Sequence, residues 1–203
     1  MQPEVNLQRQ TMRRYRALVE LREDWGGALV LCSGAGCAAS GIPVAASIAG
    51  AATLAIEADA EAVKAALRRG ELDFVVNTLA EALRTLKNQI RLKRPLSVGL
   101  IADVEVSLGE LASRGVRPDA TIEPASSLAA REDEMFFAAY DAGELQRLDA
   151  ALLEALPAED VRKRWIRRLP QYLREARSGG RWIWLSGEER EALAARGFNP
   201  ESR

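Results

Sequence analysis

A glycine-containing turn that follows a short apolar run constrains the fold of this chain most. Residues 28–32 are apolar, and Gly34 and Gly36 follow them in the pattern Gly-x-Gly-x-x-Ala, which ends at Ala39. A second apolar run ends at Glu57, roughly 20 residues after the glycines, the place of the ribose-binding acid in a dinucleotide-binding βαβ unit. The pattern therefore predicts a strand, a tight turn, a helix and a second strand, and it indicates a nucleotide as the class of ligand.

Further apolar runs and helical patterns extend this unit into a whole sheet. Short apolar runs alternate with helical patterns, and continuous apolar runs are typical of parallel strands that are covered on both faces. The alternation predicts an α/β, Rossmann-like, doubly wound parallel sheet of about five or six strands. The expected strands are residues 28–32, 53–57, 72–76, 96–101 and 119–122, and the expected later helices are residues 60–69, 78–93 and 108–114.

The rest of the chain differs in character, and we expect three parts. Residues 1–25 form an N-terminal helix, residues 26–125 form the Rossmann-like domain, and residues 126–203 form a mostly helical extension. The extension is expected to pack on the core or on a partner subunit. Its predicted elements are helices at residues 135–140, 144–156, 160–177 (interrupted at Pro170) and 187–196, and a short strand at residues 181–185.

Composition excludes several classes of function. The chain has no histidine, which excludes serine and cysteine hydrolases with a histidine base and also histidine-ligated zinc sites. Its net charge of -1 gives no overall field that attracts nucleic acid or an anionic membrane. We therefore predict no metal site, no nucleic-acid partner and no membrane partner, and we assign no catalytic residue.

The two cysteines, Cys32 and Cys37, lie in the apolar, glycine-containing segment. This pattern favours a reducing compartment over a disulfide scaffold. Cys32 is interpreted as a core residue and Cys37 as a small residue that fills space beside the turn. No signal peptide is visible at the N-terminus, and the prediction is a cytoplasmic protein.

The candidate ligand-binding residues surround the glycine turn. The backbone N–H groups of Cys37, Ala38 and Ala39, at the start of the expected helix, would present partial positive charge to a phosphate. Glu57 would accept hydrogen bonds from ribose hydroxyls, and its charge would favour NAD over NADP. The alternative is a structural turn without a ligand. Asp103 and Glu105 follow the fourth strand, at the sheet edge where ligands bind, although exposed acids are common in loops.

A basic and aromatic cluster occupies the last third of the chain. The cations at residues 162–164, 167 and 168 lie near Trp165, Tyr172, Trp182 and Trp184. Helical spacing places Trp165 on an apolar face and the cations on the opposite, solvated face. We interpret this cluster as a surface for docking within the protein or onto a second subunit of a homo-oligomer, rather than for nucleic acid.

Several segments occur together in one order and resemble the central NAD-binding domain of urocanase (urocanate hydratase). They include Pro95-Leu-Ser-Val-Gly-Leu100 and Arg114-Gly-Val-Arg-Pro-Asp119, and the resemblance covers residues 25–125. It implies NAD bound as an electrophile, with residues 34–41 as the phosphate loop and Glu57 at the ribose. Asp103 replaces the family's asparagine, and residues 124–128 replace its Gln-Thr-Ser-Ala-His segment. The family's catalytic cysteine has no match here.

Three hypotheses follow. The first is a stand-alone urocanase-like dinucleotide-fold protein that binds NAD or a related nucleotide and lacks hydratase activity. The second is an enzyme similar to S-adenosylmethionine-dependent methyltransferases, in which an acid after the second strand also holds a ribose. The third is a ligand-free interaction subunit that docks through its C-terminal third.

Overall fold

The computed structural model describes residues 6–124 and 128–201. Five strands form one sheet in the order β3-β4-β2-β1-β5, and all of its neighbouring strands pair in parallel. The α/β Rossmann-like fold is therefore confirmed. The strands are β1 (Leu29–Ser33), β2 (Ala52–Glu57), β3 (Phe74–Val76), β4 (Leu96–Ile101) and β5 (Ala120–Ile122).

Strand β1 is the point at which the strand order reverses. Val30 of β1 pairs with Thr53 of β2 on one side and with Ala120 of β5 on the other. Strands β2, β4 and β3 lie on one side of β1, and β5 lies on its other side. In open α/β sheets, ligands bind in the crevice outside the carboxyl ends of the strands at such a reversal. The loop after β1 is therefore correctly placed for a ligand.

Helices cover both faces of the sheet. Helices α2 (Ile42–Ala49) and α3 (Ala60–Arg69) pack on the face that carries Val30 and Cys32, whereas α4 (Leu79–Arg91) and α5 (Val104–Ser113) pack on the face that carries Leu29 and Leu31. Side chains of successive strand residues point to opposite faces, so the apolar run of β1 fills both cores. The expected helix at residues 108–114 is longer than predicted because Asp103 caps its first turn.

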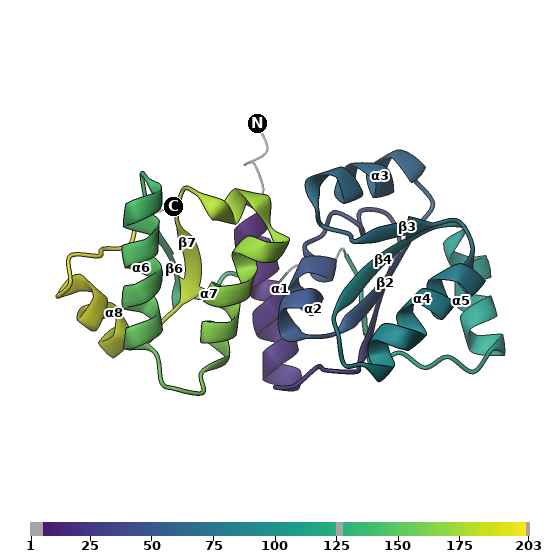
Figure 1. The fold of residues 1–203 in the computed structure, drawn as a ribbon, viewed down its shortest axis with the longest axis horizontal. Coiled ribbons are helices and arrows are strands. Elements are labelled where there is room, and N and C mark those ends of the chain that lie inside the picture. Colours follow the sequence, from purple (N-terminus) through teal and green to yellow (C-terminus); the bar gives the residue numbers. More distant parts are fainter. Residues whose placement is uncertain (1–5, 125–127, 202–203) are drawn as a thin grey trace.

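The N-terminal helix α1 (Leu7–Leu21) lies between α2 and the C-terminal elements (Figure 1). Its buried residues Met12, Tyr15 and Leu18 belong to the same core cluster as α2. Tyr15 stacks on Trp165 of α7 with ring centroids 5.5 Å apart. Helix α1 therefore shares its buried surface between the Rossmann-like part and the rest of the chain.

The C-terminal elements contain an antiparallel strand pair and helices. Strands β6 (Glu134–Phe137) and β7 (Arg181–Trp184) pair with Phe136 opposite Trp182, and helices α6 (Ala142–Ala155), α7 (Val161–Tyr172) and α8 (Gly187–Ala194) surround them. The predicted strand at residues 181–185 is confirmed, whereas the predicted helix at residues 135–140 is wrong. Met135, Phe136 and Phe137 lie in a strand because their backbone pairs with distant β7.

Two other details of the C-terminal part follow from local chemistry. Pro170 lies in the last turn of α7, and the predicted interruption of residues 160–177 comes two residues later than expected, because α7 ends at Tyr172. A short 3-10 helix, η1 (Arg174–Arg177), follows. Within residues 6–124 and 128–201, no helix is both long and apolar enough to span a membrane.

Candidate functional site

The loop after β1 carries the predicted glycines in left-handed conformation. Gly34 and Gly36 have φ values of 103° and 81°, which favour glycine. Tight turns follow one another, since the Cys37 N–H donates to the Gly34 carbonyl at 3.1 Å and the Ala39 N–H donates to the Gly36 carbonyl at 3.2 Å. Ala35 and Gly36 are exposed, and the Ala35 N–H has no acceptor among the described residues. The tip of the loop is therefore open to solvent.

Glu57 holds this loop from the end of β2. One carboxylate oxygen accepts the Gly36 N–H at 2.9 Å, and the other accepts the Ala38 N–H at 3.0 Å. Glu57 is only 3% exposed. Its hydrogen bond with the Ala38 N–H is buried, whereas its hydrogen bond with the exposed Gly36 is only partly buried. The sequence singled out Glu57 and these amides as separate ligand contacts, and the structure brings them together with each other. The spacing in the sequence predicts that Glu57 lies near the loop, but it does not predict that Glu57 accepts hydrogen bonds from the loop amides.

Helix α2 begins at Ile42, and the predicted helix start near residues 37–39 is wrong. Gly41 precedes the helix with a φ of 74°, and a Cβ built there would lie 2.5 Å from Thr11 Oγ1 of α1. Glycine is required because α1 approaches the backbone so closely. The amides of Cys37, Ala38 and Ala39 therefore belong to turns rather than to the first turn of a helix, and α1 covers the true helix start.

Cys32 and Cys37 are joined by a disulfide, with Cα atoms 5.9 Å apart. Both residues are buried, as expected for core residues. The interpretation of both as reduced, space-filling thiols is wrong, because the turn folds Cys37 back onto the end of β1. The cysteine content therefore no longer supports a reducing compartment, and the cytoplasmic location stays a prediction.

Asp103 lies at the same sheet edge but has a structural partner. Its carboxylate accepts the Val106 N–H at 2.9 Å and caps α5. The backbone joins this region to the candidate site, since the Ala102 N–H donates to the Glu57 carbonyl at 3.3 Å. Glu105 lies in the first turn of α5 and is exposed. Of the segment at residues 124–128, residues 125–127 fall outside the described residues.

The amides of the loop hold a carboxylate of the protein itself. Two backbone N–H groups converge on one negatively charged group, next to left-handed glycines, as in the concave anion sites that successive backbone amides form. Within the described residues, no group of three or more cysteine and acidic side chains could hold a metal ion. At this loop the protein therefore binds one of its own anionic groups through backbone amides.

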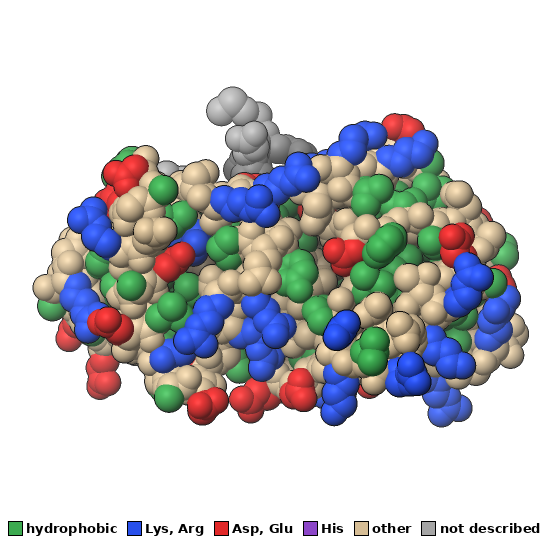
Figure 2. All heavy atoms as spheres, viewed as in Figure 1, with side chains coloured by type: hydrophobic (Ala, Val, Ile, Leu, Met, Phe, Trp, Pro, Cys, Tyr) green, Lys and Arg blue, Asp and Glu red, His purple; other side chains and the backbone are tan. Residues whose placement is uncertain are grey.

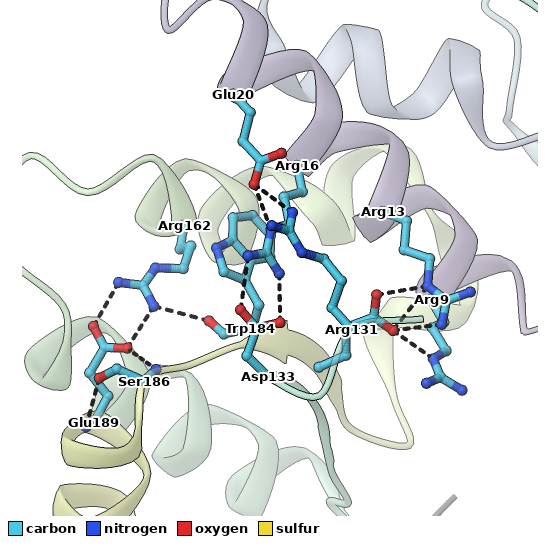
Figure 3. A network of polar contacts seen from close by, with 11 residues as sticks. Arg9, Arg13, Arg16, Glu20, Arg131, Asp133, Arg162, Trp184, Ser186 and Glu189 are labelled. Carbon is cyan, nitrogen blue, oxygen red and sulfur yellow. Dashed lines mark hydrogen bonds and ion pairs between the residues drawn. The ribbon is translucent and has the colours of Figure 1, made fainter. Parts of the chain in front are cut away.

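A second polar cluster joins α1 to the C-terminal part (Figure 3), and sequence reasoning missed it. Arg13 donates to both oxygens of Glu134, and Arg16 donates to both oxygens of Asp133 at 2.8 Å. Arg131 donates to Glu20 Oε1 at 2.8 Å, the same oxygen that accepts a hydrogen bond from Arg16. A cavity of about 260 Å³ lies beside these groups. Arg9, Arg13 and Arg16 recur at helical spacing along α1, and this pattern in the sequence could have predicted the cluster.

The C-terminal cations also have partners in the protein. Arg162 forms an ion pair with Glu189 (Figure 3). It also forms an ion pair with Asp160. Arg164 and Arg168 donate to the Ala49 and Ile48 carbonyls at the end of α2. The apolar helix face exists as predicted, with Trp165, Ile166 and Leu169 buried, but several cations lie at contacts rather than on a solvated face. Arg164 and Arg168 therefore attach α7 to α2, whereas Arg162 attaches it to β7 and α8.

Comparison with known protein families agrees with this fold. The family model described as the Urocanase Rossmann-like domain matches residues 10–132, which is more than half of the chain. The matched range contains most of α1, the whole parallel sheet, the loop after β1 and Glu57. Rossmann-like domains of this family are associated with NAD in general. The chain therefore belongs to the urocanase family through its Rossmann-like domain.

Proposed function

We propose that this chain binds NAD or a closely related dinucleotide at the loop after β1. The observation that carries the proposal is the convergence of the Gly36 and Ala38 N–H groups on one anion, the Glu57 carboxylate, at 2.9 and 3.0 Å. A diphosphate needs the same donors. Family membership and the position of the loop at the reversal of the strand order support the same ligand class.

A dinucleotide could bind beside Glu57 in two ways. In the first, the carboxylate keeps its two amide hydrogen bonds and uses its remaining lone pairs to accept ribose hydroxyls, because an ionised carboxylate has about four acceptor positions. In the second, the diphosphate displaces Glu57 from the amides. Either way a negative charge stays close to the ribose, and the 2′-phosphate of NADP would be repelled.

We do not extend the proposal to hydration of urocanate. The chain has two cysteines, and they are bonded to each other in this structure. Neither therefore offers a thiolate to a substrate in this state. Mixing the purified protein with NAD and urocanate, and following the ultraviolet absorbance of the conjugated substrate, should show no loss of absorbance.

Isothermal titration with NAD, ADP-ribose and NADP tests the proposal. We expect NAD and ADP-ribose to bind and NADP to bind at least about tenfold more weakly, which corresponds to about 1.4 kcal/mol. No detectable binding of any of the three ligands at millimolar concentration would overturn the claim. A mass spectrum of protein purified without added ligand gives an independent reading, because a tightly held dinucleotide survives purification.

The variant Glu57→Gln distinguishes the two ways of binding. If Glu57 accepts ribose hydroxyls, loss of its charge should weaken NAD binding about tenfold or more, as for a hydrogen bond to a charged group. If Glu57 only blocks the amides, the same change should strengthen binding. Glu61→Gln is the matched control, since Glu61 is an exposed acid in the following helix.

A ligand-free interaction subunit is the second candidate, and the Glu57 contact favours it as well. The carboxylate already satisfies the two amides that a diphosphate would use. This candidate predicts that neither the natural chain nor Glu57→Gln binds any of the three nucleotides. Size-exclusion chromatography with light scattering would then show whether the chain forms an oligomer.

A further inference from the structure

We propose that Cys32 and Cys37 form a reversible thiol–disulfide site whose state controls how firmly the loop is held on Glu57. Cys32 lies in β1, and Cys37 lies in the loop five positions later. These are the two cysteines of the whole chain, and both take part in the bond. The inference rests on the proposed function only for its last step, the effect on dinucleotide binding.

The disulfide and the Glu57 carboxylate hold the same three consecutive residues. Cys37 is bonded to β1, while its neighbours Gly36 and Ala38 donate their N–H groups to Glu57 at the end of β2. The loop is therefore fastened to two adjacent strands at once. Release of the first attachment must act on the second, because the two amides belong to the residues on either side of Cys37.

Reduction changes the packing at this point. Two sulfurs joined by a bond lie about 2.0 Å apart, whereas two non-bonded atoms of similar size need about 3.5 Å or more. Cys32 sits in a central strand with paired neighbours on both sides, so it has little freedom to move. Cys37 lies in a loop whose neighbouring residues Ala35 and Gly36 are exposed. The loop therefore takes up the displacement.

The covalent step is an ordinary thiol–disulfide exchange with a dithiol reductant, either a small molecule or a thioredoxin-type protein. A thiolate of the reductant attacks one sulfur, a mixed disulfide forms, and the other protein sulfur leaves as a thiolate. The second thiolate of the reductant then attacks the mixed disulfide and releases the remaining protein sulfur. Two electrons pass to the protein, which ends with two thiols after taking up two protons, and the reductant ends as a cyclic disulfide.

Burial sets the route of this exchange. Both cysteines are 0% exposed, so a reductant reaches the sulfurs only when the loop opens. Local opening is feasible because the loop contains left-handed glycines and has an exposed tip. The exchange should therefore proceed without unfolding of the sheet, at a rate that follows the opening of the loop.

The first experiment needs no nucleotide. Protein purified without reductant is alkylated under native conditions before and after treatment with dithiothreitol, and intact mass counts the modified cysteines. We expect no modified cysteine before treatment and two after it, with unchanged circular dichroism. Two modified cysteines before treatment, together with failure of an oxidised dithiol to restore the bond, would overturn the proposal.

Hydrogen exchange then reads the coupling to Glu57. The Gly36 and Ala38 amides should exchange about tenfold faster in the reduced protein than in the oxidised protein, as expected when one hydrogen bond weakens. The Leu54 amide in β2 should not change. Cys32→Ala/Cys37→Ala should exchange like the reduced protein. Equal exchange in the oxidised and reduced forms would overturn the coupling.

Titration of ADP-ribose into the two forms tests the last step. We expect the reduced protein to bind several-fold more tightly, because its amides are released from Glu57 more easily. Equal affinity of the two forms would overturn redox control of binding. If neither form binds while the amide exchange still differs, the proposed function fails and the redox site stands.

Discussion

Glu71 is a buried carboxylate in the turn between α3 and β3. Its side chain is 1% exposed; Arg69 pairs with one oxygen, and the other oxygen has no partner among the described residues. Burial raises the pKa of Glu71 above its ordinary value, and the Arg69 guanidinium opposes the shift. The folded state therefore holds the Glu71 proton more tightly than the unfolded state. Its contribution to stability is present at low pH and is lost as the pH rises through the raised pKa.

Glu71→Gln should remove this dependence. The free energy of unfolding of the natural chain, relative to that of the variant, should fall as the pH rises from about 4, near the ordinary pKa of glutamate, to 7. Urea unfolding at several pH values measures the difference. Glu61→Gln, which changes an exposed acid, should show no such trend. A constant difference between the natural chain and Glu71→Gln would contradict the argument.

At the scale of elements, Arg181 joins β7 to α6. Its side chain is 1% exposed, and it donates to Asp149 at 2.7 Å and to the Gly180 carbonyl at 3.1 Å. Burial raises the pKa of Asp149, while Arg181 acts in the opposite direction. A buried charge that loses its partner is costly, whereas removal of both charges can be nearly neutral.

Arg181→Met should therefore destabilise the protein by about 3–5 kcal/mol, because Asp149 is left without its counter-ion. The double variant Arg181→Met/Asp149→Leu should recover much of this loss. Arg196→Met serves as control, since its ion pair with Glu154 is exposed and should contribute about 1 kcal/mol or less. Thermal and urea unfolding compare the four proteins. A double variant no more stable than Arg181→Met would contradict this account.

The elements that could be predicted from sequence are those with local signals. The apolar run at residues 96–101 and the helix at residues 60–69, which ends before Gly70, have the predicted bounds. Strand β6 could not be predicted, because Phe136 and Phe137 depend on pairing with Trp182 and Arg181, far along the chain. The start of α2 could not be predicted either, since it depends on the approach of Thr11 to Gly41.

The candidate site was predictable as a set of residues but not as a set of contacts. Gly34, Gly36 and Glu57 follow a spacing that depends on the βαβ unit alone. That Glu57 binds the Gly36 amide, and that Cys37 bonds Cys32, depends on how the loop folds over itself. Turns of this kind are determined by several weak backbone hydrogen bonds that leave little trace in residue type.

At the scale of the whole molecule, ion pairs join the parts of the protein, and cations gather on one region of its surface. Helix α1 is attached to the C-terminal part by the Arg13–Glu134 and Arg16–Asp133 ion pairs (Figure 3). Lys and Arg side chains gather over α4 (Figure 2), where the exposed cations include Arg84, Lys87 and Arg91. The prediction that the chain binds no nucleic acid stays a prediction, and this surface is where a test should look.

The Arg16–Asp133 pair should contribute to stability in a pH-dependent way. The Arg16 guanidinium, which donates to both carboxylate oxygens, holds the pKa of Asp133 below its ordinary value. This contribution is present above the ordinary aspartate pKa of about 3.9 and is lost as the pH falls through the lowered value. Asp133→Asn should therefore be less stable than the natural chain at pH 7, and the difference should shrink in acid.

Urea unfolding at neutral and acid pH measures this difference. The neighbouring exposed residue supplies the control, and Glu132→Gln should match the natural chain at both pH values. A deficit in Asp133→Asn that is the same at both pH values would show that the pair acts through packing rather than through charge.

Helix α1 is synthesised before α7 and β7, and residues of these later elements complete its surroundings. The Gln8 side chain accepts the Trp182 N–H, and the Gln8 N–H donates to Glu175. Contacts between distant parts of a chain form slowly, because a long loop must close before they gain any stability. During translation, the face of α1 that packs on α7 and β7 therefore stays exposed until those elements leave the ribosome. A nascent chain that stalls before that point should be a preferred substrate for chaperones.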